Sequence, residues 1–241
     1  MLNSLLREVR DALYVDQPFL DITIQDEAVV VEGTYLLLAK LPAYRDRGPL
    51  EEHRIRIEIP ADYPATEPKV TMLDDSIPKT ESFHCSSSGV CCITVFETWV
   101  VTHNDPTIGA FLDGPLRNFF ISQLLRLKGK DWPFDEWGHG VDGWIDAVAE
   151  FIGCRARKTE VRNVLERRHN GGPLDMDARC PCGARASAMD CCGPSLEEFW
   201  NKVDAETAEA WLHRLVELTP KLSHREIQLK IHKNRPFRRV Q

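Results

Sequence analysis

The chain has 241 residues, of which 43% are hydrophobic and 28% are charged, and its formal net charge is −7. This composition is ordinary for a globular protein with one main domain and a smaller unit, and no stretch approaches the roughly 18 uninterrupted apolar residues of a membrane span. The first ten residues, MLNSLLREVR, place charges inside an apolar stretch, which argues against a secretory signal and predicts a cytoplasmic protein with free thiols.

Charge is distributed unevenly along the chain. Residues 155–241 contain 17 lysines and arginines against 12 acidic residues, whereas residues 1–154 contain 13 against 25. In the last 21 residues Glu226 is the one acidic residue against Lys221, Arg225, Lys230, Lys233, Arg235, Arg238 and Arg239. A basic tail of this kind suits nucleic acid or an acidic protein partner, and a merely solvated tail explains it equally well. Nucleic acid is not favoured, because Phe237 is the only aromatic residue among these charges.

The first part of the chain predicts one helix followed by strands. Apolar residues recur on one stripe of residues 2–14, as in an amphipathic helix. The strand-like runs are residues 19–24, 29–38, 53–59 and, as a fourth, 69–72. The third run alternates most clearly, with Ile55, Ile57 and Ile59 on one side. A helix before a four-stranded antiparallel meander is an α+β arrangement.

Downstream of residue 115 the apolar period becomes helical. One stripe runs through residues 116–127 and another through residues 141–152, with a loop rich in turn residues between them. Residues 155–175 are basic and break at Asn170-Gly-Gly-Pro173, which predicts a linker. Ser195-Leu-Glu-Glu198 has the spacing of a capping box that opens a further helix.

Two cysteine clusters indicate two kinds of site. The first is Gly89-Val90-Cys91-Cys92-Ile93, which follows a segment bounded by prolines. Because an accessible thiol after a rigid strand edge can act as a nucleophile, this loop is a candidate active site. Two adjacent cysteines can equally be partly buried apolar residues, and the spacing alone leaves both interpretations open.

Around this first cluster the chain resembles ubiquitin-conjugating enzymes. The resemblance is carried by the initial helix and meander, by Pro60-Ala-Asp-Tyr63-Pro64-Ala-Thr-Glu-Pro68, by His84, and by Gly-x-x-Cys followed by a Trp. It covers residues 1–153 and is closer to bacterial members. Their later segments are similar to Gly114-Pro115-Leu116-Arg117-Asn118-Phe119 with Gln123, and to the stretch from Trp132-Pro133 through His139-Gly140 to Gly143.

The resemblance implies an acyl-transfer enzyme. Its cysteine would accept the C-terminus of a ubiquitin-like modifier protein from an activating enzyme as a thioester, and would pass it to an amine on a target protein. It also implies a bacterial setting associated with antiphage defence. The rival expectations are a variant that binds a ubiquitin-like protein without chemistry, and an adaptor whose second cysteine cluster and basic tail bind nucleic acid or the protein-export machinery.

The catalytic residues implied by the resemblance are Cys92, Cys91 and His84. The family pattern Gly-x-apolar-Cys-apolar assigns the nucleophile to Cys92, whereas the spacing of eight residues before Trp99 fits Cys91, and we favour Cys92. His84 matches the His of the family's His-Pro-Asn motif and is expected to order the loop, but the residues after it are Cys85 and Ser86.

The Asn of that motif, which supports the oxyanion, is therefore absent here. Hydroxyls of residues 86–88 or the amide of Asn104 could replace it. His103, Asp105 and His139 are candidates for assisting deprotonation of the amine, and a structural role is the simpler expectation for each.

The second cluster predicts a structural metal site. Cys180, Cys182, Cys191 and Cys192 have the spacing Cys-x-Cys-x8-Cys-Cys, and four thiolates so close in sequence can enclose a tetrahedral Zn2+. The spacing resembles the SEC-C motif, a small zinc-binding module. Two redox pairs or a catalytic zinc are weaker alternatives, and Cys154 is expected in the core.

The predicted organisation has four parts. Residues 1–154 form a conjugating-enzyme-like domain, residues 155–175 a basic linker, residues 176–194 the zinc module, and residues 195–241 C-terminal helices with the basic tail. No membrane partner is expected.

Overall fold

The structure, a computed structural model, describes residues 2–40, 48–133 and 138–217. The chain forms two compact units, Met1–His139 and Gly140–Gln241. The boundary therefore lies before the second helical stripe, whereas the sequence predicts it after residue 154. Three predicted segments are affected by the gaps between these ranges. The basic tail lies wholly outside the described residues, and the loop around residues 42–49 and the stretch from Trp132 to His139 lie partly outside them.

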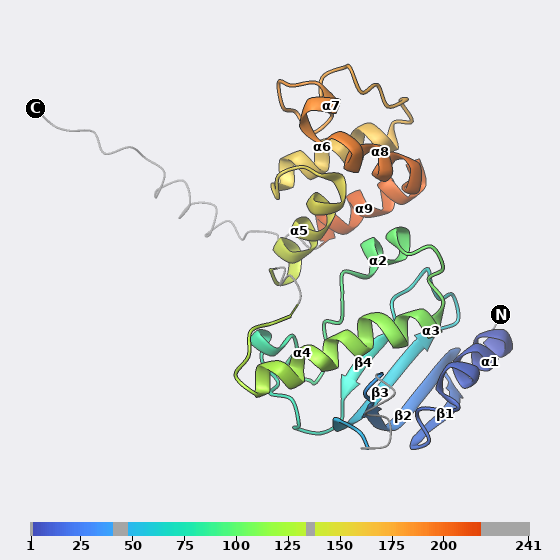
Figure 1. Cartoon of the computed structure of the whole chain (residues 1–241). Helices are drawn as coiled ribbons and strands as arrows, with labels where there is room; N and C mark the ends of the chain where they lie inside the picture. The colour runs from blue at the N-terminus through green and yellow to red at the C-terminus, as the bar shows by residue number, and fades with distance from the viewer. Residues whose placement is uncertain (1, 41–47, 134–137, 218–241) are drawn as a thin grey trace, which may run out of the picture. The chain divides into compact units, whose positions relative to one another are not determined.

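The first unit begins with a helix and an antiparallel sheet, so the predicted α+β fold class is confirmed. Its strands pair in sequential order, each with the next along the chain, and Figure 1 shows them side by side. The elements are α1 (Leu2–Leu13), β1 (Leu20–Gln25), β2 (Ala28–Leu37), β3 (Glu51–Pro60) and β4 (Lys69–Met72). Each observed boundary lies within two residues of the predicted one.

One face of this sheet forms the core of the first unit. Ile55, Ile57 and Ile59 of β3 are fully buried, and the charged residues between them face the other side. Burial of each such side chain contributes about 1.5–3 kcal/mol. The stripe of α1 that carries Leu5, Val9 and Leu13 packs into the same core.

Short helices lead from the sheet to one longer helix, α4, which crosses the sheet in Figure 1. Phe119, Phe120 and Leu124 of α4 belong to the same core as the sheet residues. These connecting elements are η2 (Glu81–Phe83), α2 (Phe96–Thr102), α3 (Ile108–Phe111), the π-helical turn η3 (Leu112–Leu116) and α4 (Arg117–Leu127).

Two hydrogen bonds hold α3 in place. The Tyr63 hydroxyl donates to the Thr107 carbonyl at 3.0 Å, and the Glu8 carboxylate accepts from the Ile108 amide at 2.8 Å. The loop that contains Tyr63 and the helix α1 thus fix the start of α3. They also fix the position from which η3 and α4 begin.

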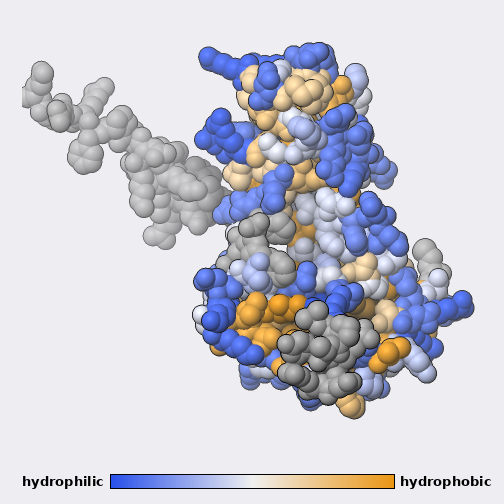
Figure 2. All heavy atoms as spheres, viewed as in Figure 1, coloured by the Kyte–Doolittle hydropathy of each residue, from blue (hydrophilic) through white to orange (hydrophobic). Residues whose placement is uncertain are grey.

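The second unit is helical and has its own core. Phe151, Phe199 and Trp211 form mutual ring contacts at 5.6 to 6.5 Å between centroids. Hydrophilic residues dominate the viewed face of the molecule in Figure 2. The elements are α5 (Gly140–Ile152), α6 (Lys158–His169), α7 (Ala188–Cys191), α8 (Gly193–Lys202) and α9 (Ala205–Glu217).

Two local expectations in this unit were wrong. The predicted linker at 155–175 contains α6, whose Val161, Val164 and Leu165 are fully buried. The capping box at Ser195 does not form, because α8 already begins at Gly193 with a proline in its first turn, a position that suits proline. Among the described helices, none is long and apolar enough to cross a lipid bilayer.

Candidate functional site

A tight loop follows η2 and presents the first cysteine cluster. Cys85 and Cys91 lie opposite one another in an isolated antiparallel bridge. Gly89 turns the chain between them with φ +85°, and an added Cβ would lie 2.7 Å from the Met72 carbonyl oxygen. The Met72 amide donates to the Gly89 carbonyl at 2.8 Å, and the Cys91 amide donates to the Val70 carbonyl at 2.9 Å. The loop is therefore fastened to β4.

The two adjacent cysteines have opposite surroundings. Cys91 is 8% exposed and belongs to the hydrophobic core, and its thiol contacts the Gly89 carbonyl at 3.6 Å. Cys92 is exposed, and its amide donates to the His84 carbonyl at 2.8 Å. Successive side chains of an extended segment point to opposite sides, which accounts for the difference. Cys92 is therefore the cysteine that a reactant can reach.

Cys92 opens into a pocket of about 770 Å³. The pocket is formed by the loop after Cys92, by α2, and by the start of α4. Its aromatic and imidazole lining comes from His84, Trp99, His103, Phe119 and Trp132. Such a concave, largely apolar site with a few polar groups is typical of a place where a ligand binds.

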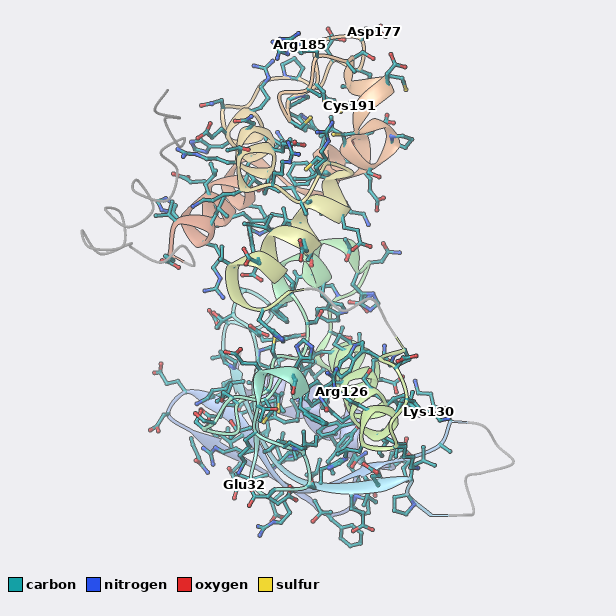
Figure 3. All side chains as sticks on the ribbon, turned by 90° about the vertical axis from the view of Figure 1, so that its left-hand side faces the viewer. Glu32, Arg126, Lys130, Asp177, Arg185 and Cys191 are labelled. Atoms are coloured by element: carbon teal, nitrogen blue, oxygen red, sulfur yellow. The ribbon has the colours of Figure 1, made fainter. Side chains whose placement is uncertain are left out.

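His84 lies at the entrance of this loop and contacts two other rings. Its centroid is 5.1 Å from that of Trp132 and 4.6 Å from that of His139. Its backbone has φ 48°, an uncommon conformation for a residue with a side chain. Gln123 of α4 is fully buried and donates to the Phe83 carbonyl at 2.8 Å, so α4 holds the residue before His84. Arg126, labelled in Figure 3, lies 5.3 Å from the Phe83 ring.

The remaining candidates separate into those that reach the pocket and those that do not. The Ser86 hydroxyl bonds the Ser88 hydroxyl at 2.9 Å and accepts from the Val90 amide at 3.0 Å, so it serves the turn. The described lining of the pocket includes none of the following candidates: residues 86–88, Asn104, Asp105 and His139. His103 does line it.

Asn118 also lines the pocket and was missed as a candidate donor. In the sequence Asn118 is one residue of a longer motif, and no spacing relates it to Cys92. Its place at the start of α4, directly after η3, brings it there.

The electrostatic surroundings of Cys92 favour the thiol over the thiolate. Desolvation raises the pKa of Cys92, and the negative charge of Glu67 raises it further. Burial raises the pKa of Cys91 more strongly, far above the ordinary range for cysteine. Both shifts disfavour the thiolate, which is the nucleophilic form, and Cys92 combines the smaller shift with access to a reactant.

Cys180, Cys182, Cys191 and Cys192 lie together in the second unit and could hold a metal ion such as zinc. Their sulfur atoms all lie within 4.8 Å of one another, and the shortest separations are 3.4, 3.6 and 3.8 Å. In a tetrahedron with Zn–S distances of about 2.3 Å, neighbouring sulfurs lie about 3.8 Å apart. The donor set therefore fits a tetrahedral ion.

The backbone around the cluster is closely constrained. Gly183 has φ +98°, and the carbonyl of Cys182 accepts from the Asn163 side chain of α6 at 3.2 Å. An added Cβ at Gly153 would lie 2.8 Å from the Cys192 carbonyl oxygen. The cluster is therefore built onto α6 and the end of α5.

A second pocket, of about 910 Å³, adjoins this cluster. Cys154, which was expected in the core, is only half-buried and lines it together with Cys191 and Arg185, both labelled in Figure 3. Burial raises the pKa of Cys191 to about 11, with hydrogen bonds to Cys182 and Cys180 adding to the effect. A ligated cation opposes this shift, because it stabilises thiolates.

The chain matches no known protein family and no curated protein.

Proposed function

We propose that this chain is a ubiquitin-conjugating-like acyl carrier. Cys92 accepts the C-terminal acyl group of a ubiquitin-like protein from an activating enzyme as a thioester. The acyl group then passes to an amine on a target protein. The observation that carries this proposal is the exposed Cys92 at a 770 Å³ pocket, beside a chemically identical cysteine that is buried.

The chemistry agrees with the surroundings of Cys92. Two successive acyl transfers need a sulfur that first attacks a thioester and then leaves as a thiolate. An activating enzyme delivers an acyl group that is already a thioester, so the attacking thiol needs less activation than it would against an amide. The apolar walls formed by Trp99 and Phe119 protect a thioester from water.

The order of elements in the first unit is similar to that of ubiquitin-conjugating enzymes. The helix α1, the four-strand meander, the Tyr63-Pro64 segment and the cysteine loop follow one another as in that family. A bacterial conjugation system with a role in antiphage defence is the setting that this resemblance suggests.

Zinc is the ion that we propose for the second unit, in a structural role. Four cysteines fill all four positions of a tetrahedral ion, which leaves none for a substrate or a catalytic water. Cys180, Cys182, Cys191 and Cys192 would hold the ion. It would tie the loop before α7 to α6 and α8.

A charging assay tests the catalytic proposal. The chain is incubated with ATP and with its cognate ubiquitin-like protein and activating enzyme, and the products are separated on non-reducing gels. We expect a thiol-sensitive adduct that Cys92→Ser abolishes and Cys91→Ser retains. Loss with Cys91→Ser alone would move the nucleophile to Cys91.

A binding protein without chemistry is the second candidate. The raised pKa of Cys92 favours it, because a thiol kept protonated is a poor nucleophile. In that case no variant forms an adduct, yet the ubiquitin-like protein binds the chain with a measurable dissociation constant by calorimetry. Binding without an adduct would replace the enzyme proposal with this one.

A further inference from the structure

We infer that His103 is the general base of the second acyl transfer, the step in which an amine attacks the Cys92 thioester. This inference rests on the proposed function and assigns a role within it. The attacking nitrogen of a lysine is an ammonium at neutral pH and has no lone pair until it loses a proton. A group in the pocket that accepts this proton therefore accelerates the step.

The chemistry of the pocket leaves few groups for this task. Among the lining residues that the structure describes, the ionisable side chains are His84, Cys92 and His103. Cys92 carries the acyl group at this stage, so its sulfur is not available as a base. No carboxylate and no lysine side chain lines the described part of the pocket. Among the described lining residues, the choice is therefore between the two histidines.

The two histidines differ in how they are held. His84 has ring contacts with both Trp132 and His139, and its own carbonyl accepts the Cys92 amide. That arrangement suits a residue that orders the loop. His103 is exposed at the end of α2 and has one ring contact among the described residues, with Trp99 at 5.2 Å between centroids.

The position of His103 is defined although its side chain is exposed. Its amide donates to the Trp99 carbonyl at 2.9 Å and closes α2, while the Trp99 ring packs against Phe96 and Phe111 in the core. One side of the imidazole therefore lies against a ring that the core holds in place. A general base that is positioned in this way can accept a proton from the amine in a defined geometry.

The proposed step balances as follows. His103 removes a proton from the ammonium, and the neutral amine attacks the thioester carbonyl carbon to form a C–N bond. The tetrahedral intermediate loses a second proton from nitrogen as the C–S bond breaks. Cys92 leaves with the bonding electron pair and takes up a proton. The products are an amide and a free Cys92 thiol, and the two ammonium protons account for one thiol proton and one released to solvent.

A chemically charged protein separates this inference from the proposed function. Incubation of the full chain with the benzyl thioester of acetylglycine acylates Cys92 by thiol exchange, without any activating enzyme. Excess reagent is removed, and lysine or hydroxylamine is added. Loss of the acyl group is followed by mass spectrometry on the peptide that contains Cys92. Cys92→Ala gives the background from other thiols.

The two nucleophiles distinguish a base from a structural residue. Hydroxylamine is largely unprotonated at neutral pH, whereas lysine is not. We expect His103→Gln to slow the reaction with lysine by roughly 10²-fold and to change the reaction with hydroxylamine far less. Added imidazole should restore the lysine reaction. His84→Gln is the matched control and should slow both nucleophiles alike.

Two outcomes would overturn the inference. Equal lysine rates in His103→Gln and wild type would show that no base acts from this position. An equal loss with both nucleophiles, not restored by imidazole, would make His103 a structural residue. Either result leaves the charging of Cys92 by the activating enzyme untouched, so the proposed function stands or fails separately.

Discussion

Replacing Gly89 by alanine tests whether the cysteine loop is held against β4 as the structure indicates. Gly89 has φ +85°, and a Cβ there would lie 2.7 Å from the Met72 carbonyl oxygen, a backbone atom that also belongs to the sheet edge. The Met72 amide donates to the Gly89 carbonyl on the same side. The new methyl group therefore cannot be accommodated without separating the loop from β4.

A second glycine provides a matched control. Gly129 also has positive φ, +69°, but an added Cβ there meets no atom within 4 Å. Gly129→Ala should cost only the strain of a left-handed alanine, about 1 kcal/mol, partly offset by the lower entropy of the unfolded chain. Gly89→Ala adds the clash with the carbonyl, so we expect a total of about 2–4 kcal/mol.

Urea-dependent hydrogen exchange measures the difference in the first unit alone. Amides of β2 and β3, resolved as peptides by mass spectrometry, report the free energy of opening of this unit. Gly89→Ala should also expose Cys91, which would become open to alkylation in the native protein. If the two glycine variants lose equal stability, the close approach to Met72 has no energetic cost and the description of the loop is wrong.

Three further predictions concern the thiols. Cys91→Ser places a hydroxyl in the core and should lower the free energy of unfolding, measured by urea titration, by about 1–3 kcal/mol. Cys92→Ser should leave the free energy of unfolding unchanged within error in the same titration. Glu67→Gln removes a negative charge that raises the pKa of Cys92, so more thiolate is present at a given pH. Iodoacetamide should then label Cys92 faster at pH 8, and a slower or equal rate would contradict this. A strong chelator, or Cys182→Ser, should lower the melting temperature of the second unit, and elemental analysis should find one zinc per wild-type chain. Full stability after zinc removal would refute a structural role.

The sheet of the first unit was predictable because its strands are buried on one main face. Ile55, Ile57 and Ile59 alternate with charged residues, and an apolar period of two is the pattern of a half-buried strand. The helix α6 was missed for the opposite reason. Its buried stripe consists of Val161, Val164 and Leu165 within a segment rich in arginine, so composition outweighed spacing in the prediction of a linker. The apolar spacing was nevertheless helical, and three buried residues suffice when a neighbouring helix covers them.

The metal cluster and the pocket differ in how much of each the sequence could reveal. All four thiols lie within thirteen residues, so the local chain brings them together and their spacing predicts the cluster. The pocket depends on distant residues. Asn118 lines the same pocket as Cys92 because Glu8 and Tyr63 fix the start of α3, from which η3 and α4 follow, and His103 lines it from the end of α2. No spacing in the sequence expresses that dependence.

Sequence spacing also fails to decide between Cys91 and Cys92, although these two residues are adjacent. The two residues are chemically identical neighbours, and motif spacing supports either of them. The two side chains point to opposite sides of an extended segment. Two hydrogen bonds set the register of this segment: the Cys91 amide donates to the Val70 carbonyl, and the Cys92 amide donates to the His84 carbonyl. A shift of one residue in that register would bury Cys92 and expose Cys91. Gly89 closes the turn that precedes this segment, with a positive φ of +85° that residues with a side chain rarely adopt. The different accessibility of the two thiols thus depends on a turn three residues before Cys92, and the alanine variant that strains this turn should make Cys91 reactive beside Cys92.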